Sequence, residues 1–161
     1  MTLYEYYNQA DPSMTWVHGD FWQGQTFTPQ TAHTITKVKL VVYRHGSPGT
    51  LTVGIRATDV DGHPTGADLC SGEIDGNSLP DAWTAAFTEI PLDPHPALSE
   101  DTKYAIVARA PAGNQNNYVR WIHAVSAPYG RGAHEFSSDG GSTWDTDFGK
   151  DLKFKEYGEA I

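Results

Sequence analysis

ITKVKLVVYR at Ile35–Arg44 and LTVGIRAT at Leu51–Thr58 decide the fold of this chain. In both stretches apolar residues alternate with polar ones, which places successive side chains on opposite faces of a β-sheet. The connection His45–Gly49 is rich in residues that accept turn dihedrals, so we predict that the two stretches pair as a hairpin. One face of each strand should be core and the other at least partly wet.

The same alternation recurs along the chain between clusters of Gly, Pro, Asp and Asn, and no helical stretch interrupts it. Further predicted strands are Phe21–Thr28, Phe87–Leu92, Lys103–Ala110, Tyr118–Val125 and Leu152–Tyr157. We therefore predict an all-β chain of about nine strands, packed as an antiparallel β-sandwich with jelly-roll or Greek-key connections. The predicted core positions are Val38, Leu40, Val42, Leu51, Val53, Ile55, Tyr104, Ile106 and Phe154.

The size of the chain, 161 residues, suits a single domain. Residues 1–20 are predicted to be an N-terminal arm, or a lead-in strand and loop, and residues 21–161 the sandwich domain. The only cysteine is Cys70, which rules out an intramolecular disulfide and suits a buried thiol. A core of this size needs no metal or disulfide to hold it.

The charge balance of 11 basic and 20 acidic residues, a net charge of −9, repels phosphate backbones, so we predict no nucleic-acid partner. No segment has the roughly 20 apolar residues that span a bilayer, so we predict no membrane insertion. The N-terminus has neither the basic nor the apolar region of a signal peptide. We expect either a piece of a larger secreted protein or a chain that leaves a cytoplasm by assembly and lysis, as virion proteins do.

No catalytic constellation stands out in the sequence, and enzyme is the least favoured class. There is no nucleophile elbow, no P-loop, and no histidine spacing typical of a metal site. SSDGGSTW at Ser137–Trp144 satisfies the Asp-box pattern S-x-D-x-G-x-x-W, but it occurs once, and we interpret it as a hairpin device in which Gly141 takes a positive φ. We predict a non-enzymatic protein without a cofactor.

Calcium is a second interpretation of the loop that begins at Asp59. Asp59 and Asp61 are two apart, as in a calcium loop, but His63 and Cys70 stand where an EF-hand needs oxygen ligands. A looser calcium site would use Asp59, Asp61 and Asp68. The alternative is a solvated loop whose Asp and Gly residues serve the turns.

Aromatic residues outside the predicted core suggest a ligand site. Trp16, Trp83 and Tyr129 lie in polar or Pro/Gly-rich segments, where an aromatic face can stack on a sugar ring. The predicted carbohydrate-binding residues are Trp16, Trp83, Tyr129, Asp81, Asn116 and Asn117.

The N-terminal run LYEYY at Leu3–Tyr7 alternates aromatic side chains along an extended segment. Such a strand can add to the sheet edge of a neighbouring subunit, so Leu3, Tyr4, Tyr6 and Tyr7 are predicted to form an assembly arm. An edge strand of the chain's own sandwich is the equal alternative.

Several segments together resemble a known type of domain: QTFTP at Gln25–Pro29, the run Gly46–Leu69, KYAIVARAP at Lys103–Pro111, the Asp-box and FKEYG at Phe154–Gly158. They resemble jelly-roll-like β-sandwich modules of phage and virus particle proteins and of large bacterial and archaeal surface proteins. The resemblance implies a non-enzymatic module and carries no catalytic residue over.

Two functions follow from this resemblance as hypotheses. The first is a structural or adhesion protein, a capsid decoration protein on the virion surface, whose partners are other virion or surface subunits in many copies on a lattice or in a homo-oligomer. The alternative is a carbohydrate-binding module of an extracellular or cell-surface protein, whose partner is a glycan.

Overall fold

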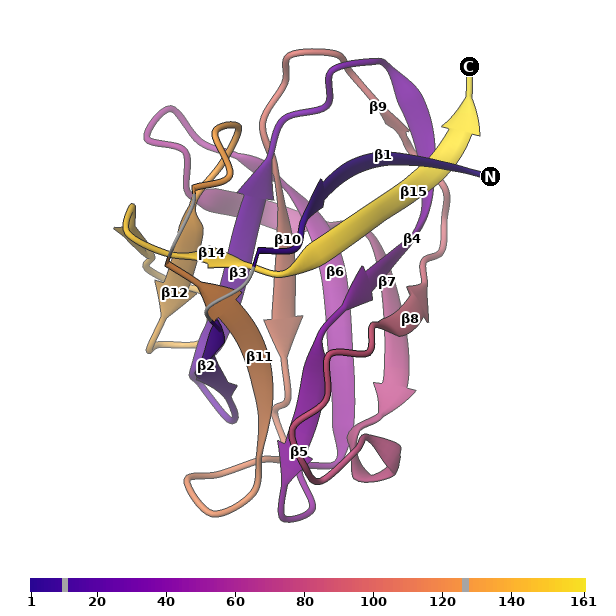
Figure 1. Cartoon of the computed structure of the whole chain (residues 1–161). Coiled ribbons are helices and arrows are strands. Elements are labelled where there is room, and N and C mark those ends of the chain that lie inside the picture. The colour runs from indigo at the N-terminus through magenta and orange to yellow at the C-terminus, as the bar shows by residue number, and fades with distance from the viewer. Residues whose placement is uncertain (10–11, 126–127) are drawn as a thin grey trace.

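The computed structural model describes residues 1–9, 12–125 and 128–161. These residues form a sandwich of antiparallel β-sheets, which confirms the predicted fold class (Figure 1). Within the described residues the only helical element is the short 3-10 helix η1 at Gly76–Ser78, and no helix is long and apolar enough to cross a membrane.

The strands outnumber the nine that were predicted. Two predicted strands are divided: Val41 separates β4 from β5, and Lys153 separates β14 from β15. Others, such as β9 and β13, are only two or three residues long. The strands of the described residues are β1 (Thr2–Tyr7), β2 (Pro12–Val17), β3 (Trp22–Phe27), β4 (His33–Leu40), β5 (Val42–His45), β6 (Thr50–Thr58), β7 (Pro64–Asp75), β8 (Thr88–Pro91), β9 (Ala97–Leu98), β10 (Tyr104–Arg109), β11 (Tyr118–Ala124), β12 (His134–Ser137), β13 (Asp145–Asp147), β14 (Asp151–Leu152) and β15 (Phe154–Ala160).

One layer of the sandwich is a six-stranded sheet in the order β13-β12-β3-β10-β6-β7. The other layer, nearer the viewer in Figure 1, consists of two smaller sheets. One has the order β1-β15-β4-β8 with β9 on β4, and the other, called here the β11 sheet, has the order β14-β11-β2 with β5 on β11. The backbone of Ile122 joins them, because its N–H donates to Val41 and its carbonyl accepts from Lys153.

The core lies between the two layers and contains all nine positions predicted from alternation, each of them buried. Trp121, Phe27 and Phe154 are the largest of its fully buried side chains. Cys70 is also buried, and burial raises the pKa of its thiol to about 12. The thiol therefore acts as a small apolar core group.

The predicted hairpin between the two decisive strands is wrong. β4 pairs with β15 and β8, whereas β6 pairs with β10 and β7 in the opposite layer. Residues 46–49 therefore carry the chain from one layer to the other. The apolar faces of these strands meet across the core rather than side by side. Periodicity shows that a strand has an apolar face, but not which strand lies beside it.

The N-terminal segment is part of the sandwich. β1 forms the edge of its sheet by pairing with β15, and β2 pairs with β11; residues 10 and 11 of the predicted lead-in lie outside the described residues. Tyr7 is buried, and Tyr4 stacks on His33 with ring centroids 3.7 Å apart. Of the four predicted arm residues, Leu3 and Tyr6 have exposed side chains.

Glu5 anchors this edge strand in the interior. Its carboxylate is 2% exposed and accepts hydrogen bonds from the Tyr129 hydroxyl at 2.7 Å and from the Gln30 backbone at 3.0 Å. The register between β1 and β15 shifts between Leu3 and Glu5. An irregular register and an inward-facing charge both protect a strand edge from pairing with another chain.

We predict that Ile106→Ala on β10 lowers the free energy of unfolding by about 2–5 kcal/mol, because it leaves a cavity in a fully buried site. Val60→Ala is the matched control, since Val60 is fully exposed and its loss should change stability by less than about 0.5 kcal/mol. Urea denaturation, monitored by tryptophan fluorescence, measures the free energy of unfolding of both variants. Equal effects of the two substitutions would contradict the assignment of the core.

We also predict that deletion of residues 1–8 destabilises the whole domain, because it removes the buried Tyr7 and leaves Tyr129 without its carboxylate partner. Loss of a buried aromatic side chain alone costs about 3–5 kcal/mol. The melting temperature, followed by circular dichroism, should fall by at least 10 °C or so. An unchanged melting temperature would show that β1 is a dispensable arm.

Candidate functional site

The outward face of the β11 sheet carries a concentration of aromatic side chains. Pairing places Tyr118 of β11 opposite His45 of β5, and Arg120 opposite both Tyr43 of β5 and Trp16 of β2. Since side chains alternate along a strand, these residues point away from the core, whereas Val119 and its neighbour Trp121 point into it.

These side chains form a continuous row across the sheet. Trp16 packs edge-on against Tyr118 with centroids 6.3 Å apart, and the Arg120 guanidinium lies 5.4 Å from the Tyr118 ring and 5.1 Å from the Tyr43 ring. Trp83, from the segment between η1 and β8, packs edge-on against Tyr43 at 6.1 Å. We call Trp16, Tyr118, Arg120, Tyr43 and Trp83 the aromatic row. Its two tryptophans are about half exposed, whereas Tyr43 is only 2% exposed and supports its neighbours from a buried position.

Polar groups border the aromatic row on the side of β5. His45 stacks on Tyr118 with centroids 4.9 Å apart and planes 20° apart. Arg120 Nη2 donates to the Tyr118 hydroxyl at 3.2 Å and lies 3.4 Å from His45 Nδ1. The row therefore combines aromatic rings with hydrogen-bonding groups in fixed positions.

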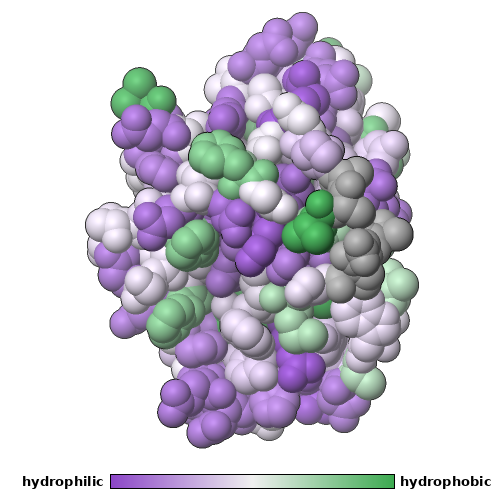
Figure 2. All heavy atoms as spheres, turned by 60° about the vertical axis from the view of Figure 1, so that its left-hand side comes forward, coloured by the Kyte–Doolittle hydropathy of each residue, from purple (hydrophilic) through white to green (hydrophobic). Residues whose placement is uncertain are grey.

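The surface is hollowed on both sides of Trp16. One depression, of about 310 Å³, is lined by Trp16, Tyr118, His18 and Gln115. The other, of about 230 Å³, extends from Trp16 and Met14 towards Phe136 and Lys150. Figure 2, which brings the side of β2 and β12 forward, shows single apolar residues among hydrophilic ones rather than one apolar patch.

The residues predicted to bind carbohydrate do not all lie in exposed loops. Trp16 lies on strand β2 rather than in a loop, and Trp83 lies outside the strands, as predicted, so that the two mark opposite ends of the aromatic row. Asp81 is exposed and forms an ion pair of 3.8 Å with Arg44.

Asn116 and Asn117 lie in the turn before β11, next to Gln115, which lines a depression beside Trp16. The side chain of Asn117 is used within the fold, since its Oδ1 accepts from the Ser47 backbone at 2.8 Å and its Nδ2 donates to Asn114. Asn114, Gln115 and Asn116 are the amides of this turn that face solvent.

Tyr129 requires a correction, because it belongs to the core and not to an exposed loop. Its side chain is 9% exposed and packs edge-on against Phe154 at 5.3 Å. Burial, followed by the hydrogen bond to Glu5, raises the pKa of its hydroxyl. A ring held in this way cannot stack on a ligand.

The predicted calcium residues do not come together. Asp68 is held by Arg56 Nε at 2.8 Å and Arg109 Nη2 at 2.7 Å; although burial opposes it, these hydrogen bonds lower the pKa of Asp68. Asp59 instead accepts from the backbones of Asp61 and His63 and so closes its own turn. The described part of the chain contains no group of three or more His, Cys, Asp and Glu side chains that could hold a metal ion.

The Asp-box forms the hairpin between β12 and β13. The Ser137 hydroxyl accepts from the Gly141 backbone at 2.9 Å, Asp139 accepts from the Thr143 backbone at 2.8 Å, and Gly141 has a φ of +84°. Trp144 closes the hairpin by packing on Trp22. This geometry agrees with its interpretation as a hairpin device.

One buried acid lies near this hairpin. Glu135 is 1% exposed and bonds His63 Nδ1 at 2.5 Å, beside a polar depression of about 350 Å³. Burial raises the pKa of Glu135, and the bond to Glu135 raises the pKa of His63. Glu89, on β8 in the opposite layer, pairs with Lys37.

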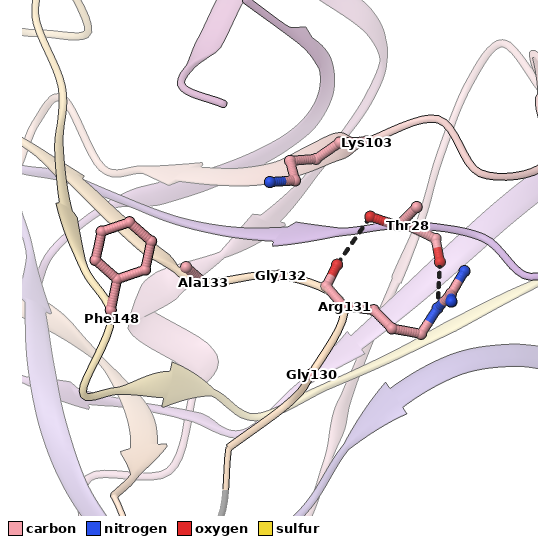
Figure 3. A pocket seen from close by; sticks show the side chains of 7 residues that line it. All are labelled: Thr28, Lys103, Gly130, Arg131, Gly132, Ala133 and Phe148. Atoms are coloured by element: carbon pink, nitrogen blue, oxygen red, sulfur yellow. Dashed lines mark hydrogen bonds between the residues drawn. The ribbon is translucent and has the colours of Figure 1, made fainter. Parts of the chain in front are cut away.

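A further depression, of about 360 Å³, opens where residues 130–133 pass Thr28 (Figure 3). Lys103 and Phe148 stand at its sides. Arg131 is occupied by its hydrogen bond to the Thr28 carbonyl and by ion pairs with Glu5 and Asp101. Backbone and small residues make up much of the remaining wall, so few side chains are placed to select a ligand.

No family model and no curated protein matches the sequence. The resemblance to jelly-roll-like modules therefore stays a prediction. The aromatic row is therefore the candidate functional site.

Sequence reasoning missed Tyr118, Arg120, Tyr43 and His45. Alternation could have found them: once Trp121 is assigned to the core, Tyr118 and Arg120 must lie on the outward face of the same strand. Alternation could not show that β2 and β5 flank this strand and complete the row.

The depression beside Trp16 also borders His134, whose buried position predicts acid sensitivity. Burial, with a smaller effect of the neighbouring His123, lowers the pKa of His134 to about 4. The unfolded chain takes up this proton near pH 6.5, so stability present above pH 6.5 is lost as the pH falls towards 4. The loss amounts to roughly 3 kcal/mol for this group.

We therefore expect His134→Gln to lose less stability than the unaltered chain when the pH falls from 7.5 to 4.5, as measured by urea denaturation. Comparing the two proteins cancels the contributions of other titrating groups. His95→Gln is the control, because His95 is exposed. An identical pH dependence in all three proteins would rule out a buried, neutral His134.

Proposed function

We propose that this chain is a non-enzymatic binding module that recognises carbohydrate through the outward face of the β11 sheet. The aromatic row carries this proposal, with a half-exposed tryptophan at each end and a hollowed surface beside Trp16. Aromatic faces bind the C–H face of a sugar ring, and nearby polar groups bind its hydroxyls.

The placement of the row favours binding without rearrangement. Trp16 and Tyr118 project from two hydrogen-bonded strands, and contacts with their neighbours restrict their rotamers. A ligand that meets side chains already held in place loses less entropy on binding. Gln115 and His45 supply donors and acceptors beside the rings.

Affinity at one such site would be weak, of micromolar to millimolar order. Many copies displayed on a virion or a cell surface would raise the avidity by orders of magnitude without any new contact. A lattice of this kind remains our proposal for the setting. The protected edge of β1 argues that contacts between copies would use other surfaces than strand addition at β1.

The proposal is tested by screening the protein on an array of plant, bacterial and host glycans and measuring hits by titration calorimetry. We predict that Trp16→Ala and Tyr118→Ala each weaken binding about tenfold or more, because each removes a stacking surface. Phe148→Ala should leave binding unchanged, since Phe148 is 84% exposed and lies outside the aromatic row.

Circular dichroism must show that the variants fold. Absence of any glycan hit would overturn the proposal, and so would a hit whose affinity is the same in Trp16→Ala, Tyr118→Ala and the unaltered protein.

A further inference from the structure

We infer that the carbohydrate bound by the aromatic row is acidic, and that the carboxylate of a uronic or sialic acid unit binds the guanidinium of Arg120. This inference rests on the proposed function and names the class of glycan. Its basis is an arginine at the centre of the row that has no acidic partner among the described residues.

Arg120 differs from every other arginine of the chain. Arg44 pairs with Asp81, Arg56 and Arg109 pair with Asp68, and Arg131 pairs with Glu5 and Asp101. In the part of the chain that the structure describes, no carboxylate lies within ion-pair distance of Arg120. Acidic residues outnumber basic ones by 20 to 11, so an unpaired arginine is unexpected on charge balance.

The guanidinium of Arg120 is held in a defined position. It lies between the rings of Tyr43 and Tyr118, and its Nη2 is bonded to the Tyr118 hydroxyl. The Nε atom is buried and has no hydrogen-bond partner among the described residues, so a ligand carboxylate would bind the Nη atoms. A planar, pre-oriented guanidinium suits a carboxylate, which can accept two parallel N–H bonds.

The acids near the row are already paired. Asp81, close to Trp83 in the sequence, forms an ion pair with Arg44. Asp147, which lines one of the depressions beside Trp16, forms an ion pair with Lys150. Arg120, by contrast, keeps its charge available for an anionic ligand.

The arrangement favours a glycan over an acidic peptide. The exposed rings of Trp16 and Trp83 lie at the two ends of the row and the partly exposed Tyr118 lies beside Arg120, so sugar rings could stack on them while one carboxylate meets Arg120. The depressions beside Trp16 offer room for ring-shaped units.

The test compares the binding of tetragalacturonate with that of its methyl ester, which keeps the rings and removes the charge. Calorimetry at low salt should show the acid binding about tenfold tighter, the size of effect expected for a hydrogen-bonded ion pair. Added sodium chloride should reduce this preference, because salt screens the charges.

Variants locate the effect. Arg120→Gln should lower the affinity for the acid to that for the ester and leave the affinity for the ester unchanged, while Arg120→Lys should retain part of the preference. Arg44→Gln is the matched control: it removes an arginine from a neighbouring strand that is already paired, and should preserve the preference. Trp16→Ala should weaken the binding of both the acid and the ester. Thermal unfolding checks that each variant is folded.

The outcomes separate the two proposals. Equal affinities for the acid and the ester would overturn the proposal of an acidic glycan and leave the proposal of carbohydrate binding intact. An unchanged acid preference in folded Arg120→Gln and Arg120→Lys would overturn the role of Arg120. Failure to bind any glycan would overturn both proposals, and binding of polyglutamate through Arg120 without glycan binding would assign the face to a protein partner.

Discussion

Burial of apolar side chains between two β-layers is the interaction on which the rest of this structure depends. Each strand contributes only one face to that core, so its other face must be directed to solvent. On β11 the same alternation that buries Val119 and Trp121 presents Tyr118 and Arg120 outward. The candidate binding face is thus a consequence of packing the core, and the rigidity of the core is transmitted to it.

Buried polar groups add specificity to this packing. His33 and Glu156 pair at 2.6 Å with both side chains fully buried, and Glu5 lies nearby under Tyr129. Such groups are costly to bury, and breaking one partnership leaves an uncompensated group behind. Through Glu5 and Glu156 this network ties β1 and β15, the first and last strands, to the body of the sandwich.

In our proposal, the aromatic row recognises its ligand on the surface of the sandwich. Its rings are held by edge-on contacts and by the guanidinium of Arg120, not by a loop that must order on binding. The arginine is at once a packing element between two tyrosines and a charge without an acidic partner in the described chain. In our proposal, that combination makes the face selective for an acidic glycan.

The sequence by itself determined the all-β class, the nine core positions and the Asp-box turn, because these depend on local alternation and on turn residues. It also singled out Trp16 and Trp83. Only the tertiary structure decided that these two tryptophans lie at opposite ends of one aromatic row, that Tyr129 is buried, and that β4 and β6 lie in opposite layers. The physical reason is that alternation specifies which side of a strand is apolar, whereas strand neighbours are chosen by the packing of the whole chain.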